Sequence, residues 1–368
     1  MSLIAHLKTR LAAPSRGSST LGRSLATSRR SQGLTGDPTK GATEEGSWEK
    51  MSLSRANLRA LGWQDGDFRK PIVTIASPWS NANPCNYHHR ELTDLLVDAI
   101  ERRGGKAFVC GTPVISDGMT QGTTGMRYSL ISRDLIADCI ELMHEGYMAD
   151  AMITLGGCDK TVPAAAMPLA RTNAVGIMLY GGTAMPGLCE GCYNSKGGLG
   201  LDAKDGMEAI ASYTSGQMTL DTFKALEANA LPGPGTCSAM FTANTMSSAV
   251  EALGLSPPHT ASHPATTRVQ TLVDSEGGGG STAAAAAAAG DVLVTTMTPA
   301  SASPATTTLE VTAQKRRDVE EVAELLLGAG AGCSGGQAGA TSTASKHEGA
   351  RARKHCPSLS GYLYRRTS

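Results

Sequence analysis

Between residues 70 and 255, short apolar runs alternate with stretches that have the periodicity of amphipathic helices. Each apolar run has the length of a buried strand, and strands that alternate with helices are typical of an α/β domain. The sequence therefore predicts a largely parallel sheet with flanking helices. The predicted strands are residues 71–76, 107–110, 151–155 and 177–180.

Three helices are predicted between and after these strands. Residues 89–103 stop at a pair of glycines and should cover the sheet, Ser132 can cap a second helix, and residues 242–253 form a third that ends at Gly254. The predicted buried faces are Leu92, Leu95, Leu96, Ala99 and Ile100 in the first helix and Leu135, Ile136, Cys139, Ile140 and Met143 in the second.

Three cysteines far apart in the sequence share one local setting, a turn rich in glycine, proline or asparagine. They are Cys85, Cys158 and Cys237. Cys158 directly follows the third predicted strand, and ligands of open α/β sheets collect beyond the carboxyl ends of strands. Thiolates hold iron-sulfur clusters, and a cluster with three protein ligands leaves one iron open to substrate. A single cysteine is more often a small buried side chain, so this hypothesis depends on the shared setting.

Two aspartates lie in neighbouring turns. Asp117 precedes a glycine and Asp159 follows Cys158, so both offer carboxylate oxygens of the kind that Mg²⁺ prefers. Lys160 is a cation and opposes a metal unless it is carbamylated. The residues alone favour an ordinary salt bridge for Lys160.

Composition excludes several classes of partner. Lys+Arg 33 and Asp+Glu 33 balance, so no net field favours nucleic acid or an anionic membrane as a partner. No apolar run reaches the roughly 18 residues of a transmembrane helix. The nine cysteines lie in a long chain without an apolar signal-peptide core, which favours metal ligation or free thiols in a reducing compartment over disulfides.

The two ends of the chain differ in composition from its middle, which leaves residues 48–264 for the α/β domain. Residues 1–36 lack Asp and Glu but contain several basic residues among serines, which predicts an organelle transit peptide within residues 1–47, mitochondrial rather than plastid. A disordered basic tail is the alternative. Residues 265–368 are a predicted low-complexity tail with one helix near 314–327. The apolar stripe of that helix is Val319, Val322, Ala323 and Leu326.

Several longer motifs occur in a fixed order between residues 58 and 264. They include Pro84-Cys85-Asn86-Tyr87-His88, Ser116-Asp117-Gly118, Gly157-Cys158-Asp159-Lys160, Tyr180-Gly181-Gly182-Thr183, residues 232–237 and Phe241-Thr242-Ala243-Asn244-Thr245-Met246. With these motifs the chain resembles the dihydroxy-acid dehydratase family, which also contains the sugar-acid and phosphogluconate dehydratases. The resemblance covers the amino-terminal half of a typical member.

The resemblance implies a set of ligands and a reaction. Cys85, Cys158 and Cys237 would hold an iron-sulfur cluster, either [2Fe-2S] or [4Fe-4S]. The implied Mg²⁺ ligands are Asp117, Asp159 and a carbamylated Lys160. Family members convert a small 2,3-dihydroxy acid into a 2-keto acid, and the family suggests a homodimer. The expected substrate is 2,3-dihydroxy-3-methylbutanoate of valine and isoleucine synthesis, with a sugar acid as the alternative.

The carboxy-terminal domain of the family has no counterpart in this sequence. In relatives that domain supplies a glutamate ligand to Mg²⁺ and the serine that abstracts the substrate proton. The catalytic base is therefore not assigned, and a truncated enzyme is expected. The alternative is a non-catalytic remnant that binds a cluster or pairs with a family subunit.

Four other features bear on the site. We expect His88 and His89 at the surface or in an orienting role rather than as ligands. The cysteines of Cys189-Glu190-Gly191-Cys192 are expected in an exposed loop rather than in a zinc site. Gly181-Gly182 could cradle substrate oxygens, although most double glycines form turns. Ala239 stands where relatives commonly have glycine, and it adds a side chain close to the expected cluster.

Overall fold

A four-stranded sheet forms the centre of the computed structural model, which describes residues 31–189, 192, 199–266 and 311–328. The strands are β1 (Ile72–Ser77), β2 (Lys106–Gly111), β3 (Ala151–Gly156) and β4 (Val175–Tyr180). They lie in the order β2-β1-β3-β4, and every neighbouring pair is parallel. The predicted parallel α/β fold is confirmed, and each predicted strand is found to within two residues at either end.

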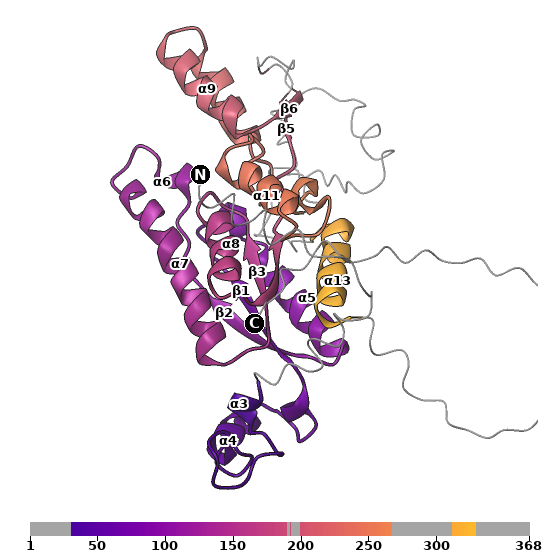
Figure 1. Cartoon of the computed structure of the whole chain (residues 1–368). Coiled ribbons are helices and arrows are strands. Elements are labelled where there is room, and N and C mark those ends of the chain that lie inside the picture. The colour runs from indigo at the N-terminus through magenta and orange to yellow at the C-terminus, as the bar shows by residue number, and fades with distance from the viewer. Residues whose placement is uncertain (1–30, 190–191, 193–198, 267–310, 329–368) are drawn as a thin grey trace, which may run out of the picture.

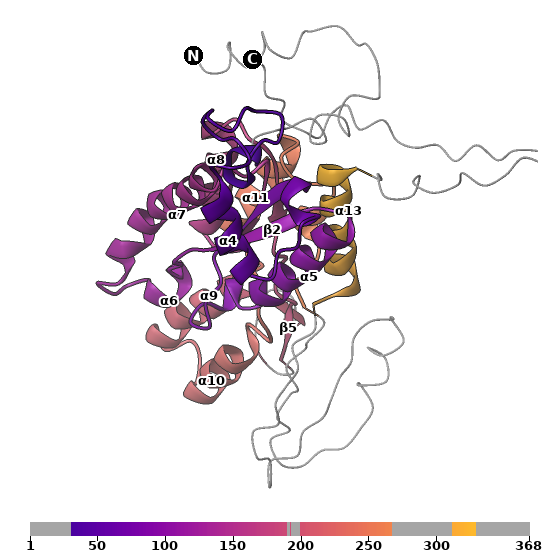
Figure 2. The same cartoon turned by 90° about the horizontal axis from the view of Figure 1, so that it is seen from below.

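Two helices cover one face of the sheet (Figures 1 and 2). They are α5 (His89–Arg102) and α13 (Ala313–Leu327), and both pack on the strand residues Val73, Ile153 and Leu179. The predicted stripe of α13 is confirmed, because Val319, Val322, Ala323 and Leu326 are all buried. Helix α13 is therefore part of the hydrophobic core. It reaches α5 from far along the chain: Val311 N, just before α13, donates to Glu91 Oε1 in α5, and 220 positions separate the two residues.

Lys315 joins α13 to the end of the sheet. Its side chain is fully buried, and its Nζ donates to the carbonyl oxygens of Tyr180 (2.8 Å) and Thr260 (3.1 Å). The same nitrogen lies 3.0 Å from Asp318 Oδ2, so the buried charge has a partner within its own helix. Helix α13 is thus anchored to β4 and to η3 (Thr260–Ser262) by hydrogen bonds as well as by apolar contacts.

Three helices cover the other face of the sheet (Figure 1). They are α7 (Met126–Gly146), α8 (Thr161–Arg171) and α11 (Thr242–Ala252). Their buried side chains meet Met152 and Met178, which point away from the α5 side because neighbouring strand residues alternate between faces.

Helix α7 corrects two predictions. It begins at Met126 after a Gly125 cap without a side-chain hydrogen bond, so Ser132 lies inside the helix and does not cap it. The Ser132 hydroxyl donates to Ser129 O instead. Ile136 and Ile140 are buried as predicted, but Leu135 is 50% exposed because it lies on the side of the helix that faces away from the sheet.

A small lobe follows β4. It contains the antiparallel pair β5 (Gly187–Leu188) and β6 (Leu199–Leu201), then α9 (Ala203–Thr214) and α10 (Leu220–Asn229). Thr183 and Thr236 are paired where the lobe leaves and re-enters the domain. The lobe is therefore an insertion whose two ends are held together.

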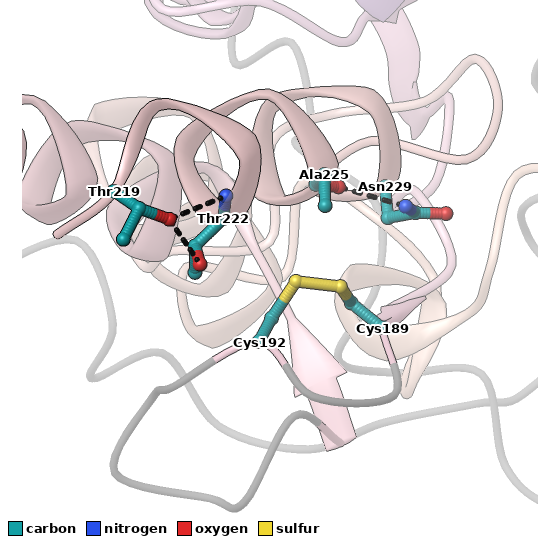
Figure 3. Close-up of a disulfide and its surroundings, with 6 residues drawn as sticks. All are labelled: Cys189, Cys192, Thr219, Thr222, Ala225 and Asn229. Atoms are coloured by element: carbon teal, nitrogen blue, oxygen red, sulfur yellow. Dashed lines mark hydrogen bonds between the residues drawn. A yellow bond between two sulfur atoms is a disulfide. The ribbon is translucent and has the colours of Figure 1, made fainter.

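The lobe corrects the prediction of an exposed Cys189–Cys192 loop. Both sulfurs are buried, and they form a disulfide beside α10 (Figure 3). Leu201, Ala209 and Leu226 complete the small apolar cluster around them. The two cysteines therefore act as core residues of the lobe.

An amino-terminal extension packs below the sheet at the end opposite the cysteine loops (Figure 1). It contains α3 (Gln32–Thr35), α4 (Ser52–Ala60) and η1 (Asp67–Arg69), and its core includes Trp63 and Phe68. Ser31 N donates to Asp150 Oδ1 at 3.1 Å. Residues 1–30 of the predicted transit-peptide segment 1–47 lie outside the described residues, as do residues 267–310 and 329–368 of the predicted tail 265–368. Among the helices that are described, none has the length and apolarity needed to span a membrane.

Candidate functional site

The three predicted cysteine loops meet beyond the carboxyl ends of the strands. Cys85 lies in η2 (Pro84–Asn86) after β1, Cys158 directly follows β3, and Cys237 follows the lobe. Gly235 N donates to Pro84 O at 3.0 Å, and the Thr236 hydroxyl donates to Gly157 O. Hydrogen bonds between residues adjacent to the cysteines therefore hold the three loops together.

Short polar side chains set the local conformation of two of these loops. Asn83 Oδ1 accepts a hydrogen bond from Cys85 N at 2.9 Å, which is an Asx turn. Thr161 Oγ1 accepts hydrogen bonds from Gly157 N (3.1 Å) and Cys158 N (2.8 Å), so it caps the turn between β3 and α8. A backbone that is fixed in this way positions each sulfur before any ligand arrives.

Gly157 allows the first two loops to touch. A Cβ at this position would lie 2.6 Å from Cys85 O and 2.8 Å from His89 Nε2. Neither neighbour can easily move, because the first is backbone and the second belongs to a fully buried side chain. Glycine is therefore required here by close approach.

The three thiols influence one another's ionisation. A hydrogen bond with the Cys85 thiol lowers the pKa of Cys158 to about 7, although burial opposes the shift. The same contact and burial raise the pKa of Cys85 well above its usual value. Burial, followed by the charge of Cys158, raises the pKa of Cys237 to about 11. The shift of Cys158 favours its thiolate, whereas the shifts of Cys85 and Cys237 favour the neutral thiol.

Asp117, Asp159 and Lys160 lie together next to the cysteines. Asp117 begins α6 (Asp117–Thr120), and Lys160 Nζ donates to Asp117 Oδ2 at 2.7 Å and also to Asp159 Oδ2. Ser129 Oγ, from α7, donates to the other oxygen of Asp117 at 2.6 Å. Burial lowers the pKa of Lys160, but its hydrogen bonds to the two carboxylates outweigh burial and raise it. The unmodified lysine is therefore a cation bridging two carboxylates.

A cavity of about 570 Å³ opens beside Cys237, between α11 and η3. Its lining is mixed: Ser238, the residue after Cys237, contributes with Asn244 and Glu251, and apolar side chains such as Met240 and Pro258 line the rest. The Glu251 carboxylate accepts backbone hydrogen bonds from His259 (2.8 Å) and Ala261 (3.0 Å), which offset its charge. The space is large enough for a small polar molecule next to the third cysteine.

Comparison with known proteins agrees with this arrangement. Residues 70–313 match the model of a family described as dihydroxy-acid/6-phosphogluconate dehydratase N-terminal. The chain belongs to this dehydratase family.

Curated bacterial relatives carry the name dihydroxy-acid dehydratase. The chain is 45% identical over 208 residues to dihydroxy-acid dehydratase 3 of Bordetella bronchiseptica, which is 56% of this chain and 36% of that relative. It is 47% identical over 205 residues to dihydroxy-acid dehydratase 1 of Cupriavidus pinatubonensis, again 56% of this chain and 36% of the relative. The chain thus spans about a third of the length of the curated relatives it matches.

The side chains at the candidate site fit the two expected groups, an iron-sulfur cluster and Mg²⁺, to different degrees. Sulfur donors suit iron, and hydrogen bonds within the protein hold the three cysteine loops together. Among the described residues, however, no three His, Cys, Asp or Glu side chains are placed to hold one metal ion. This is compatible with a cluster, whose thiolates bind different irons. The two aspartates provide only two ligands for Mg²⁺, so a carbamylated Lys160, converted from a cation into an oxygen donor, would be needed to complete the set.

Two histidines next to Cys85 are buried rather than at the surface, which corrects the first of the two roles expected for them. Burial lowers the pKa of His88 to about 4 and that of His89 well below its usual value, so both imidazoles are neutral. His88 Nε2 lies 2.8 Å from Gly181 O, and it must be the donor because a carbonyl only accepts. The expected orienting role therefore fits His88.

Gly181-Gly182 forms a tight structural turn, in which the N–H of Gly181 is already used within the protein. Gly181 N already donates to Gly156 O at 2.8 Å, and Gly182 has φ +105 and accepts a hydrogen bond from Thr236 N at 2.9 Å. A Cβ on Gly182 would lie 2.7 Å from the backbone of Ala265. Both glycines serve the close packing that holds the Cys237 loop.

Proposed function

We propose that this chain is the ligand-bearing part of an iron-sulfur hydro-lyase that converts a 2,3-dihydroxy acid into a 2-keto acid. The branched-chain dihydroxy acid of valine and isoleucine synthesis is the proposed substrate, because the curated relatives are named dihydroxy-acid dehydratases. The convergence of Cys85, Cys158 and Cys237 beside two aspartates is the observation that carries the proposal.

Each proposed group has a defined chemical task. A cluster with three thiolate ligands supplies an iron with an open position, a Lewis acid for the hydroxyl that leaves. Mg²⁺ supplies positive charge for the carboxylate and for the charge that develops on the enolate side. Both tasks depend on ligands held at fixed positions by the surrounding chain.

The chain's own residues provide that fixed setting. Asn83, Thr161 and Thr236 hold the cysteine turns, while Ser129 orients one oxygen of Asp117. Cys158 is 3% exposed, which keeps water away from the sulfur. The cavity beside Cys237 offers room for a small hydroxy acid. The residue that removes the substrate proton is not assigned among the described residues.

Two alternatives are tested by the same experiment. A sugar acid is the alternative substrate, since the family description also includes 6-phosphogluconate dehydratase. A protein that binds a cluster without turnover is the second alternative, since the chain spans 36% of its relatives.

The test is anaerobic reconstitution of the full chain with iron, sulfide and Mg²⁺. Iron content, visible absorbance and 2-keto acid formation are measured with a branched-chain dihydroxy acid and with a sugar acid. Cys158→Ser is compared with Cys139→Ser, a matched change at a half-buried free cysteine on α7. Cluster and turnover that are lost only in Cys158→Ser support the enzyme. A cluster without turnover identifies a binding protein, and no cluster in the unaltered chain refutes the proposal.

We also propose import into mitochondria, with plastids as the alternative, on the composition of residues 1–47. The test fuses these residues to a fluorescent protein and replaces Arg10, Arg16 and Arg23 by serine as the control. Mitochondrial signal that is lost in the control supports import, whereas a diffuse signal from the unaltered segment contradicts it.

A further inference from the structure

Asn83 is a buried asparagine that lies directly before the Pro84-Cys85 turn. Its side chain is 1% exposed, and its Oδ1 accepts the hydrogen bond from Cys85 N at 2.9 Å. A backbone N–H can only donate, so the atom that faces it must be the oxygen of the amide. This contact therefore fixes the orientation of the side chain, and Nδ2, with its two hydrogens, is left for another partner.

Nδ2 of Asn83 is an orphaned buried donor. It makes no hydrogen bond of ordinary geometry to any residue that the structure describes. A buried amide N–H without an acceptor destabilises the folded protein, and such groups are rare in native structures. An orphaned donor next to a predicted ligand therefore indicates an acceptor that belongs to the site itself.

The sulfur of Cys158 is the acceptor that this donor faces. The hydrogen bond with Cys85 lowers the pKa of Cys158 most, burial opposes it, and the amide of Asn83 lowers the pKa further. Nδ2 therefore lies near the Cys158 sulfur, which is itself almost fully buried. Asn83 thus contacts both loops, with its oxygen on the backbone of one and its nitrogen toward the sulfur of the other.

The contact with Cys158 should strengthen when a cluster binds. A neutral thiol sulfur is a weak acceptor, whereas hydrogen bonds to an ionised acceptor are shorter and about twice as strong. Cysteine binds metals as the thiolate. The donor that lacks a partner of ordinary geometry beside the thiol therefore gains a strong one once Cys158 is a ligand.

We propose that Asn83 is a positioning residue of the cluster site: its Nδ2 donates to the Cys158 sulfur while its Oδ1 holds the Cys85 turn. This inference rests on the proposed function, because it gives Asn83 a role toward the cluster that this function requires. A hydrogen bond to a ligand sulfur stabilises the negative charge on it. Asn83 therefore favours the reduced cluster and raises its reduction potential.

The first test needs no cluster. Asn83→Ser keeps a side-chain oxygen that can accept from Cys85 N, but it has no nitrogen that reaches Cys158. Urea unfolding of the full chain, of Asn83→Ser, of Cys158→Ala and of the double variant gives a double-mutant cycle. We expect the two changes to be coupled by at least about threefold in the equilibrium constant of unfolding. Additive effects overturn the proposal.

Asn244→Ser is the matched control for both tests. Asn244 is also buried, at 4% exposed, but its Nδ2 donates to the Tyr180 hydroxyl at 3.2 Å instead of facing a cysteine. Its effect on unfolding should add to that of Cys158→Ala. Coupling as strong as that of Asn83→Ser would trace the first result to general loosening of the loops and overturn the proposal.

The second test measures the reduction potential after anaerobic reconstitution of the full chain with iron and sulfide. Asn83→Ser should lower the equilibrium constant of one-electron reduction at least about tenfold, which is about 59 mV, and Asn244→Ser should change it much less. A residue that only holds the turn would not have this effect, because serine keeps the acceptor for Cys85 N.

A measurement on the unaltered chain removes the dependence on variants. Pulsed electron paramagnetic resonance of the reduced cluster, with ¹⁵N in the asparagine side chains, should show a coupled nitrogen. The coupling should be absent in Asn83→Ser and present in Asn244→Ser. A chain without this coupling, or with the same coupling in Asn83→Ser, overturns the proposal.

The outcomes separate this inference from the proposed function. An unaltered chain that binds no cluster refutes the proposed function, and the double-mutant cycle then decides alone whether Asn83 contacts Cys158. A cluster with the same reduction potential in Asn83→Ser and in the unaltered chain overturns the role of Asn83 and leaves the proposed function standing.

Discussion

Replacing Gly157 with alanine should separate the Cys85 loop from the Cys158 loop. The added Cβ would lie 2.6 Å from Cys85 O and 2.8 Å from His89 Nε2, well inside ordinary contact distance. Both neighbours are fixed: Pro84 O, next to Cys85, accepts from Gly235 N, and His89 is fully buried. The clash must therefore be relieved by moving one loop away from the other.

The expected cost follows from measured overpacking in protein cores. An extra methyl group in a well-packed site destabilises by about 1–3 kcal/mol, and two rigid neighbours place Gly157→Ala in the upper part of that range. Urea unfolding of the chain without added iron gives this value directly. The matched control is Gly111→Ala at the end of β2, where a Cβ would meet nothing within 4 Å. We expect the control to change the free energy of unfolding by less than about 0.5 kcal/mol.

A second readout tests the link to the candidate site. After reconstitution, Gly157→Ala should bind less iron than Gly111→Ala, because its loops no longer present the sulfurs at the correct spacing. If Gly157→Ala unfolds at the same urea concentration as the unaltered chain and binds the same amount of iron, the argument from close approach is wrong.

Further predictions concern buried groups. Lys315→Met should lower the free energy of unfolding by about 3 kcal/mol, because it leaves Asp318 buried without its lysine. Arg316→Met, on the exposed side of α13, should lower it by less than about 1 kcal/mol. Urea unfolding distinguishes the two variants. Folding lowers the pKa of His88 to about 4, so between pH 4 and pH 6.5 the unfolded chain binds a proton that the folded chain does not. The contribution of His88 to the free energy of unfolding should therefore be fully present above pH 6.5 and should fall as the pH drops toward 4. The share of His88 in this loss is about 3 kcal/mol at most, and the total loss should be smaller in His88→Gln when unfolding is followed against pH. Reduction of the disulfide, or Cys189→Ser, should cost no more than about 2 kcal/mol, because the bond closes a very short loop; chemical unfolding with and without a reductant measures it.

Elements with a clear local period could be predicted from the sequence. The strands and α5 follow from apolar spacing and from nearby glycines, and α13 was found by its stripe despite the low-complexity sequence on both sides of it. The start of α7 could not be found in this way, because Gly125 caps it without a side chain. The exposure of Leu135 was also hidden, since apolar residues on both faces of α7 resemble one broad core face.

The sequence predicts where the candidate site lies but not which contacts assemble it. Cys85 and Cys158 follow strands, so a location beyond the sheet could be inferred. Cys237 follows an inserted lobe, and tertiary contacts of the two residues before it, Gly235 and Thr236, bring it back. The signal that could have indicated this contact is a threonine directly before the cysteine, which is too common a pattern to be specific. The burial of the two histidines depends on the same tertiary contacts.

The position of Cys237 depends on a chain of hydrogen bonds that begins far from it. Lys315 holds Tyr180 O, His88 holds Gly181 O, and Gly182 O accepts from Thr236 N next to the cysteine. These contacts link α13, the start of α5 and the end of β4, which come from three distant parts of the sequence. All six predicted ligands and the contacts that position them therefore lie among the described residues. Under the proposed function, cluster binding and turnover would be separable properties. The first would require only groups that this chain positions itself, and the second would also require a proton-abstracting group that none of these contacts provides.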